Sequence, residues 1–321
     1  MSKVLVIVLT FLLLNTFLMA EDVILVAAKV KIDAYSPKDM KYLGKFADLK
    51  DLIKPTCMAV ASDGKLIVAG SALSYTARKS IIKLNSDGTL DKVLFENTGY
   101  NTPIDTPKAI VELDDGSLVI WDSGNKKVFK ISSTGEFLGD FFQAGADKAE
   151  LSRVSTIFKY NSDIVVAASD PDYKLVEYDS NGVFITNLTD GNEYIRNPFH
   201  VSKISNGYIM VALALVEIDG TEEQISTLIE LDDELIFVKK LISDTDIKKK
   251  SLLRPRFALK NEATGKYLII DEGRNRGTTK SYDDNLELFS PDGRYEKSLG
   301  TYEDTLLRHI ILFKGSTKKW K

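Results

Sequence analysis

The two histidines of the chain, His200 and His309, are the residues best suited to chemistry at neutral pH. An imidazole can act as a general acid or base, and two imidazoles can share a metal ion. In a chain built of repeats, either role requires that His200 and His309 occupy equivalent positions in two of the repeats. His200 lies two residues after Pro198, whereas His309 lies one residue after Arg308, which stands where other repeats have proline.

The residues two after the corresponding prolines form a predicted ring that is mostly apolar or small. Its other members are Cys57, Ala109, Thr156, Phe257 and Ile310. Transition metals in proteins take several histidine, cysteine or carboxylate ligands, so this ring is a poor metal site. The sequence therefore predicts two separate rim histidines, with no metal ion and no cofactor.

A second set of candidate residues is basic and lies just before the apolar strand patterns. Arginine predominates, and its planar guanidinium suits carboxylate or phosphate better than the point charge of lysine does. The chain as a whole has a net charge of −4, so this clustering runs against the average. The alternative is that each cation pairs with an acid in a neighbouring loop, such as Glu150 or Glu303. With the two histidines, the candidate ligand-binding residues are Lys54, Lys108, Arg153, Arg196, His200, Arg254, Arg256, Arg308 and His309.

Two kinds of β-hairpin alternate along the chain, and they must position these residues. The first kind joins two apolar-alternating strands through turns such as SDG, STG, SNG and PDG, whose residues accept positive φ or cap the turn. Six copies of each kind give six four-stranded units of about 50 residues, the size of a propeller blade. Copies of the first kind occupy residues 32–46, 81–95, 128–142, 175–188, 228–242 and 286–300. Copies of the second kind occupy residues 58–71, 109–123, 155–169, 200–214 and 257–273, with a sixth beginning at 309.

The order of the hairpins predicts how the ring closes. The chain begins with a hairpin of the first kind, which forms the outer half of a unit. It ends with the start of a hairpin of the second kind, which forms the inner half of a unit. Joining them gives both pieces partners and removes exposed strand edges. The sequence therefore predicts an all-β fold, a six-bladed β-propeller of four-stranded antiparallel blades closed between residues 23–46 and 307–321. Val23–Ala28 could be the second strand of the closing blade or an extension of its third.

Residues 106–141 resemble an NHL repeat. The matching features are Pro107 before the inner strand, Asp-Asp-Gly at 114–116 and Asp-Ser-Gly-Asn at 122–125. The resemblance implies a propeller fold. Some six-bladed propellers are calcium-dependent lactonases, and others, which have NHL repeats, are zinc-dependent lyases. Two histidines argue against the zinc lyase. The carboxylates available to a lactonase are Asp122, Asp170, Asp271 and Glu272, whose alternative role is to cap the turn after the second strand.

Residues 1–20 form an apolar segment with Lys3 near its start and Ala20 at its end. This pattern predicts a signal peptide cleaved after Ala20, with a second cleavage site after Ala28 as an alternative. The other reading is an uncleaved membrane anchor, because the apolar run is near the lower length for spanning. The predicted organisation is a signal segment at 1–20 followed by a single propeller at 21–321. The protein is then exported, and is secreted, periplasmic or at the cell surface.

The sequence contains no GxSxG, Walker, HExxH or properly placed GxGxxG motif. With one cysteine, it has no disulfide framework, and its net charge disfavours a nucleic-acid partner. The expected function is a non-enzymatic binding scaffold that recognises an anionic peptide, protein or glycan at one mouth of the propeller. Membrane contact is expected only through residues 4–20 if they are not cleaved. The alternative is a divalent-metal-dependent hydrolase or lyase, lactonase-like, with its site in the central channel.

Overall fold

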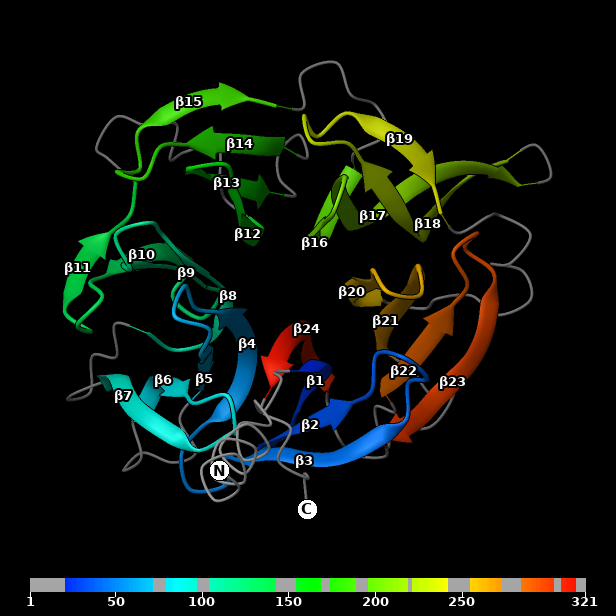
Figure 1. Ribbon diagram of the computed structural model, residues 1–321. Coiled ribbons are helices and arrows are strands. Elements are labelled where there is room, and N and C mark those ends of the chain that lie inside the picture. The colour runs from blue at the N-terminus through cyan, green and yellow to red at the C-terminus, as the bar shows by residue number, and fades with distance from the viewer. Residues whose placement is uncertain are drawn as a thin grey trace, which may run out of the picture.

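The computed structural model describes residues 21–71, 79–96, 104–142, 154–168, 174–188, 196–218, 221–241, 255–272, 284–302 and 307–315. In these residues the regular structure is entirely β, and it forms six four-stranded antiparallel sheets arranged in a ring (Figure 1). The predicted six-bladed β-propeller is confirmed.

Each blade runs from an inner strand at the channel to an outer strand at the circumference (Figure 1). Blade 1 contains β24 (Leu307–Gly315), β1 (Glu21–Ala28), β2 (Lys31–Tyr35) and β3 (Tyr42–Asp48), and blade 2 contains β4 (Lys54–Val60), β5 (Leu66–Ser71), β6 (Lys79–Leu84) and β7 (Leu90–Glu96). Blade 3 contains β8 (Pro107–Glu112), β9 (Leu118–Asp122), β10 (Lys127–Ile131) and β11 (Phe137–Asp140), and blade 4 contains β12 (Val154–Tyr160), β13 (Asp163–Ala168), β14 (Lys174–Tyr178) and β15 (Phe184–Asn187). Blade 5 contains β16 (Arg196–Ile204), β17 (Gly207–Ile218), β18 (Thr221–Leu231) and β19 (Phe237–Lys240), and blade 6 contains β20 (Pro255–Asn261), β21 (Lys266–Glu272), β22 (Asp284–Phe289) and β23 (Tyr295–Tyr302).

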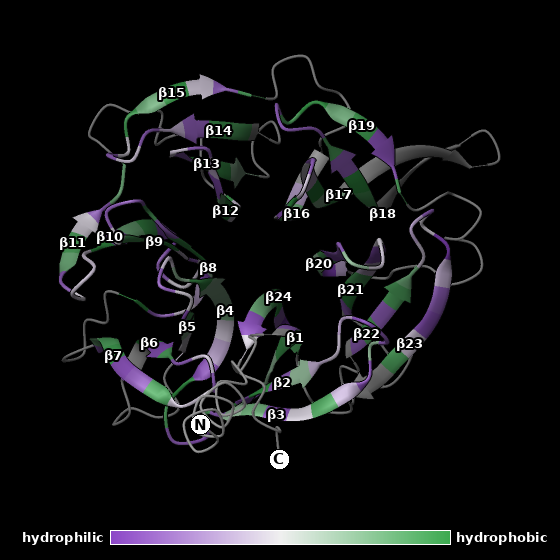
Figure 2. Cartoon of the chain, viewed as in Figure 1, coloured by the Kyte–Doolittle hydropathy of each residue, from purple (hydrophilic) through white to green (hydrophobic). Residues whose placement is uncertain are grey.

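The hydrophobic core lies between neighbouring blades. The described residues form six buried clusters, one for each pair of adjacent blades. The second strand of each blade packs against a buried cluster on both of its faces. All five residues of β9 are therefore buried, and its sequence, LVIWD, does not alternate between apolar and polar residues. Outer strands such as β3 and β11 carry both hydrophobic and hydrophilic residues, as expected at the circumference (Figure 2).

Glycines in the outer-hairpin turns allow neighbouring blades to approach closely. Gly135 and Gly182 both have positive φ, 94° and 78°. A Cβ atom on Gly135 would lie 1.8 Å from the carbonyl oxygen of Leu94 in blade 2, and one on Gly182 would lie 1.8 Å from that of Phe141 in blade 3. These turns therefore need glycine for backbone conformation and for contact with the preceding blade.

The ring closes in blade 1 as predicted. β1 pairs antiparallel with β24 on one side and with β2 on the other. Of the two alternatives for Val23–Ala28, the second strand is correct, because β1 lies between the inner strand and β2. Within the described residues, the C-terminal segment supplies the inner strand of this blade.

No helix in the described part of the chain is long and apolar enough to cross a membrane. Cys57 is fully buried, and burial raises its pKa to about 12, so its thiol stays protonated and packs as a core residue.

Candidate functional site

Each inner strand carries an irregularity near its start, at the same end of the channel. In β4 the pairing jumps from Pro55 to Cys57 while β5 advances by one residue, and β8, β12, β20 and β24 repeat this β-bulge. β16 has a longer irregularity between Arg196 and His200. A bulge re-aims the extra residue away from the regular ladder. The six residues at this position, here called the bulge ring, are Thr56, Lys108, Ser155, Phe199, Arg256 and Arg308.

All six residues of the bulge ring line one cavity of about 400 Å³, here called the bulge cavity. Trp121 and Phe257 add aromatic walls, and Ser123 adds a hydroxyl group. The guanidinium carbon of Arg256 lies 5.8 Å from the ring centroid of Phe199. Among the described residues that line this cavity, three are cationic and none is Asp or Glu. Its charge therefore favours an anion.

The structure brings together three of the cations proposed from the sequence. Lys108, Arg256 and Arg308 come from blades 3, 6 and 1 and share the bulge cavity. Lys54 is exposed at the first position of β4 and is not among the lining residues. The side chain of Arg196, at the start of β16, lies outside the described structure. The same applies to Arg153, Arg254 and the two acids proposed as local partners, Glu150 and Glu303.

The two histidines occupy equivalent positions, contrary to the sequence alignment. Ala27 of β1 pairs with His309 and Ala28 with Leu307, so Leu307 takes the position of the proline and Arg308 the bulge. The residues just after the bulge, here called the inner ring, are Cys57, Ala109, Thr156, His200, Phe257 and His309. The sequence analysis placed Ile310 in this ring and was wrong by one residue. Comparing Pro-Arg-Phe at 255–257 with Leu-Arg-His at 307–309 would have revealed the register.

Three aromatic rings of the inner ring contact one another inside the channel. The centroid of Phe257 lies 4.7 Å from that of His200 and 4.8 Å from that of His309, and the imidazoles are 5.8 Å apart. Nδ1 of His200 lies 3.5 Å from the backbone nitrogen of Ala258 and 3.3 Å from the hydroxyl oxygen of Ser202. Within the described structure, Nδ1 of His309 is buried without a hydrogen-bond partner.

Both imidazoles are neutral at neutral pH. Burial lowers the pKa of His309 to about 3. Burial, and then the neighbouring His309, holds the pKa of His200 well below its ordinary value. The inner ring therefore adds hydrogen-bonding groups to the channel but no charge.

These lowered pKa values predict that mild acid destabilises the fold. Below pH 6.5 the histidines of the unfolded chain bind protons, whereas those of the folded chain do not. Their contribution to the free energy of unfolding is therefore fully present above pH 6.5 and is lost as the pH falls. At pH 5 the expected loss from His309 is about 2 kcal/mol, and His200 adds a loss in the same direction. Urea unfolding at pH 7.5 and pH 5 measures it. The variant His200→Phe/His309→Phe keeps the ring contacts and should lose less stability in acid, whereas an equal loss in both proteins would contradict the assignment.

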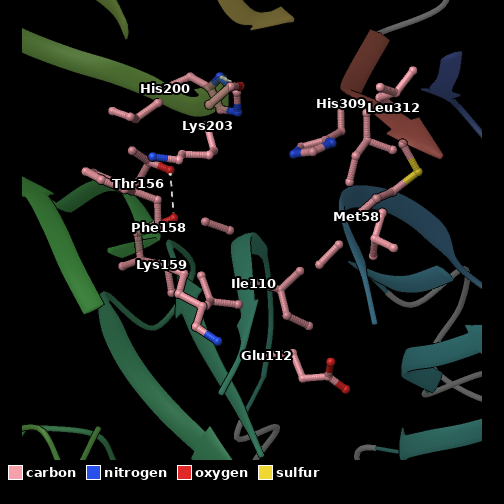
Figure 3. Close-up of a pocket in the computed structure, with 18 of the residues that line it drawn as sticks. Met58, Ile110, Glu112, Thr156, Phe158, Lys159, His200, Lys203, His309 and Leu312 are labelled. Carbon is pink, nitrogen blue, oxygen red and sulfur yellow. Dashed lines mark hydrogen bonds between the residues drawn. The ribbon is translucent and has the colours of Figure 1, made fainter. Parts of the chain in front are cut away.

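A second cavity, of about 580 Å³, opens where the inner strands end and is here called the strand-end cavity. Met58, Ile110, Phe158 and Leu312 contribute apolar walls from four blades, and His309 projects into it from β24 (Figure 3). The sequence analysis did not identify this site. Met58, Ile110 and Phe158 also belong to the buried clusters between blades, so no sequence signal separates them from ordinary packing.

Two of the carboxylates considered for a lactonase, Asp122 and Asp271, are described with their side chains, and both are buried. Asp122, at the end of β9, is fully buried. Its oxygens accept hydrogen bonds from the backbone N–H groups of Asp105 (2.6 Å) and Thr106 (2.8 Å). The N–H of Gly124 (2.9 Å) and the side-chain amide of Asn125 (3.0 Å) donate to the same carboxylate. This geometry is that of a turn cap.

The other carboxylates of that set are described only in part. Asp271 is buried near the end of β21, Glu272 is described without its side chain, and Asp170 lies outside the described residues. Within the described ranges, no group of three or more His, Cys, Asp or Glu residues is placed to hold a metal ion.

The comparisons with known proteins agree with this architecture. Residues 61–92 match the family described as "Domain of unknown function (DUF5122) beta-propeller". No curated protein gives a significant match. A solved protein of unknown function from Bacteroides caccae aligns over 91% of this chain and 99% of its own, with a TM-score of 0.57 and 13% identity. A chain of a nidogen/laminin complex aligns over 91% and 98%, with a TM-score of 0.53 and 11% identity.

Virginiamycin B lyase from Staphylococcus aureus is more distant, with a TM-score of 0.48 and 13% identity over 85% of this chain and 77% of its own. At identities this low, the two closer similarities establish a common fold and no common activity. The protein is a six-bladed β-propeller, and its function has to be argued from its own cavities.

Proposed function

We propose that this chain is an exported, NHL-like propeller that acts as a non-enzymatic binding scaffold for an anionic peptide, protein or glycan. The observation that carries the proposal is the bulge cavity, where three cations from three blades line one space without a lining carboxylate among the described residues. Export is supported by the apolar segment at 4–19. The NHL-like class is supported by Asp122 and Asn125, which cap the turn in blade 3.

The chemistry of the bulge cavity defines what its ligand must contain. Two of the cations are arginines, Arg256 and Arg308, whose guanidinium groups can bind a carboxylate, sulfate or phosphate through paired hydrogen bonds. Trp121, Phe199 and Phe257 offer apolar faces for the body of the ligand. The volume lies in the usual range for ligand cavities. An anionic side chain or sugar, presented on a longer molecule, fits these requirements.

Replacing both arginines tests the proposal. The variant Arg256→Ala/Arg308→Ala is expected to bind a glutamate-rich peptide or an oligogalacturonate at least about ten-fold more weakly, because each lost charged hydrogen bond is worth about 1.5 to 3 kcal/mol. Binding by the parent should also weaken as salt rises, since exposed charges are screened over about 10 Å at 0.1 M. Titration calorimetry at two salt concentrations measures both effects.

The matched control is Lys50→Ala/Lys54→Ala, which removes the same charge from exposed positions outside the cavity. It should bind like the parent. Equal binding by the arginine variant, or no binding of either anion by the parent, would refute the anion site. Metal content and lactone hydrolysis, measured on the same purified protein, test the alternative of a metal-dependent hydrolase or lyase.

A further inference from the structure

The strand-end cavity differs in chemistry from the bulge cavity at the other end of the channel. The contact of His200, Phe257 and His309 lies between the two: Phe257 lines the bulge cavity and the imidazoles line the strand-end cavity. The walls beyond the imidazoles are largely apolar, with Met58 and Phe158 among them. A cavity of about 580 Å³ with apolar walls has the size and character of a small-molecule site.

The charged groups at the opening of the strand-end cavity are engaged by other protein groups, and the carboxylate of Glu112 accepts a hydrogen bond from the backbone N–H of Ser62. Nζ of Lys159 lies 2.5 Å from a carboxylate oxygen of Asp114. Nζ of Lys203 lies 2.5 Å from a carboxylate oxygen of Asp233 and 4.3 Å from the ring centroid of Tyr208. The opening therefore offers two lysines that are already paired with acids and one further carboxylate, in contrast to the cationic bulge cavity, and it gives no preference to an anion.

The inner end of the cavity offers a neutral hydrogen-bonding group. The imidazole of His309 projects into the cavity from β24 (Figure 3), and its side chain is only 9% exposed. Nδ1 is itself buried and has no hydrogen-bond partner in the described structure, so Nε2 is the nitrogen that a ligand can reach, and burial keeps the ring uncharged at neutral pH. A carboxylate placed against it would lose hydration without meeting a positive charge, whereas an amide or hydroxyl group would lose much less.

We infer that the strand-end cavity binds a small uncharged molecule with a rigid apolar body and one amide or hydroxyl group directed at the imidazole of His309. The apolar walls hold the body, and the imidazole makes the single directional contact. This site is separate from the proposed anion site, so the protein would carry two ligands of opposite chemistry at the two ends of one channel.

Two fluorescent probes of the same shape test this inference. At pH 7, 2-naphthamide is neutral and 2-naphthoate is an anion. The amide is expected to bind the full-length protein at least about ten-fold more tightly than the acid, as measured by fluorescence titration. Leu312→Trp, which fills the cavity from β24, should abolish binding of the amide. His309→Phe keeps the aromatic contacts and should weaken binding by about ten-fold through loss of the hydrogen bond.

Arg256→Ala/Arg308→Ala is the matched control, because it alters the opposite cavity and should bind the amide like the parent. Circular dichroism confirms that each variant is folded. The inference is overturned if the parent does not bind the amide, if it binds the acid equally well, or if neither Leu312→Trp nor His309→Phe weakens binding. If the bulge cavity proves not to bind anions, the expected results of these three binding measurements stay the same.

Discussion

Deleting residues 307–321 is expected to abolish soluble, folded protein. The deletion removes β24, which pairs with β1 at eight positions from Glu21 to Ala28. It also removes Leu307 and Ile310 from the cluster between blades 6 and 1, and Phe313 from the cluster between blades 1 and 2. The apolar strand β1 would become an inner edge with unpaired backbone groups, a feature that promotes aggregation. Soluble yield and the thermal melting profile measure the effect.

A shorter deletion is the control for this experiment. Removing residues 316–321 leaves every described strand intact and should preserve soluble protein. Phe313→Ala is a milder change that weakens the same seam without removing β24. The ring of Phe313 packs edge-on against that of Phe46, with centroids 5.6 Å apart, and a buried Phe→Ala change costs about 3 to 5 kcal/mol. A 307–321 deletion that is as soluble and as heat-stable as the full chain would show that β24 does not close the ring in solution.

Asp122→Ala is expected to lower the free energy of unfolding by about 3 to 4 kcal/mol. The carboxylate is fully buried and accepts four hydrogen bonds, two from the segment entering β8 and two from the turn that follows β9. Bonds to a charged group are worth about 1.5 to 3 kcal/mol each, but some donors near the surface recover water when the acceptor is lost. Chemical denaturation of parent and variant measures the difference.

Asp122→Ala is also expected to weaken anion binding at the bulge cavity. The segment it holds leads directly to Lys108 and the bulge cavity, so anion affinity should fall together with stability. Asp114→Ala is the matched control, because Asp114 is exposed and, among the described residues, pairs only with Lys159 at the surface, a type of pair worth at most about 1 kcal/mol. If Asp122→Ala is no less stable than Asp114→Ala, the turn cap does not hold the blade.

The blades themselves could be predicted from the sequence because their signals are local. Alternating apolar residues and turns such as Ser-Thr-Gly at 133–135 specify hairpins without reference to the rest of the chain. The cap at Asp122 was predictable for the same reason, since its donors lie in its own blade. Closure followed from the order of the hairpins, because the incomplete units complement each other.

Only the tertiary structure decided which side chains share a cavity. The position of His309 depends on its pairing with Ala27, a strand contact between the two ends of the chain, and a one-residue error in that register moves a side chain to the other face. The same register places Arg308 at a bulge, in one cavity with Lys108 and Arg256. Lys54, which looked equivalent, pairs with Ser71 and lies two residues before the bulge position of its strand. The strand-end cavity arises from six inner strands meeting at one axis, so no single segment of sequence contains it.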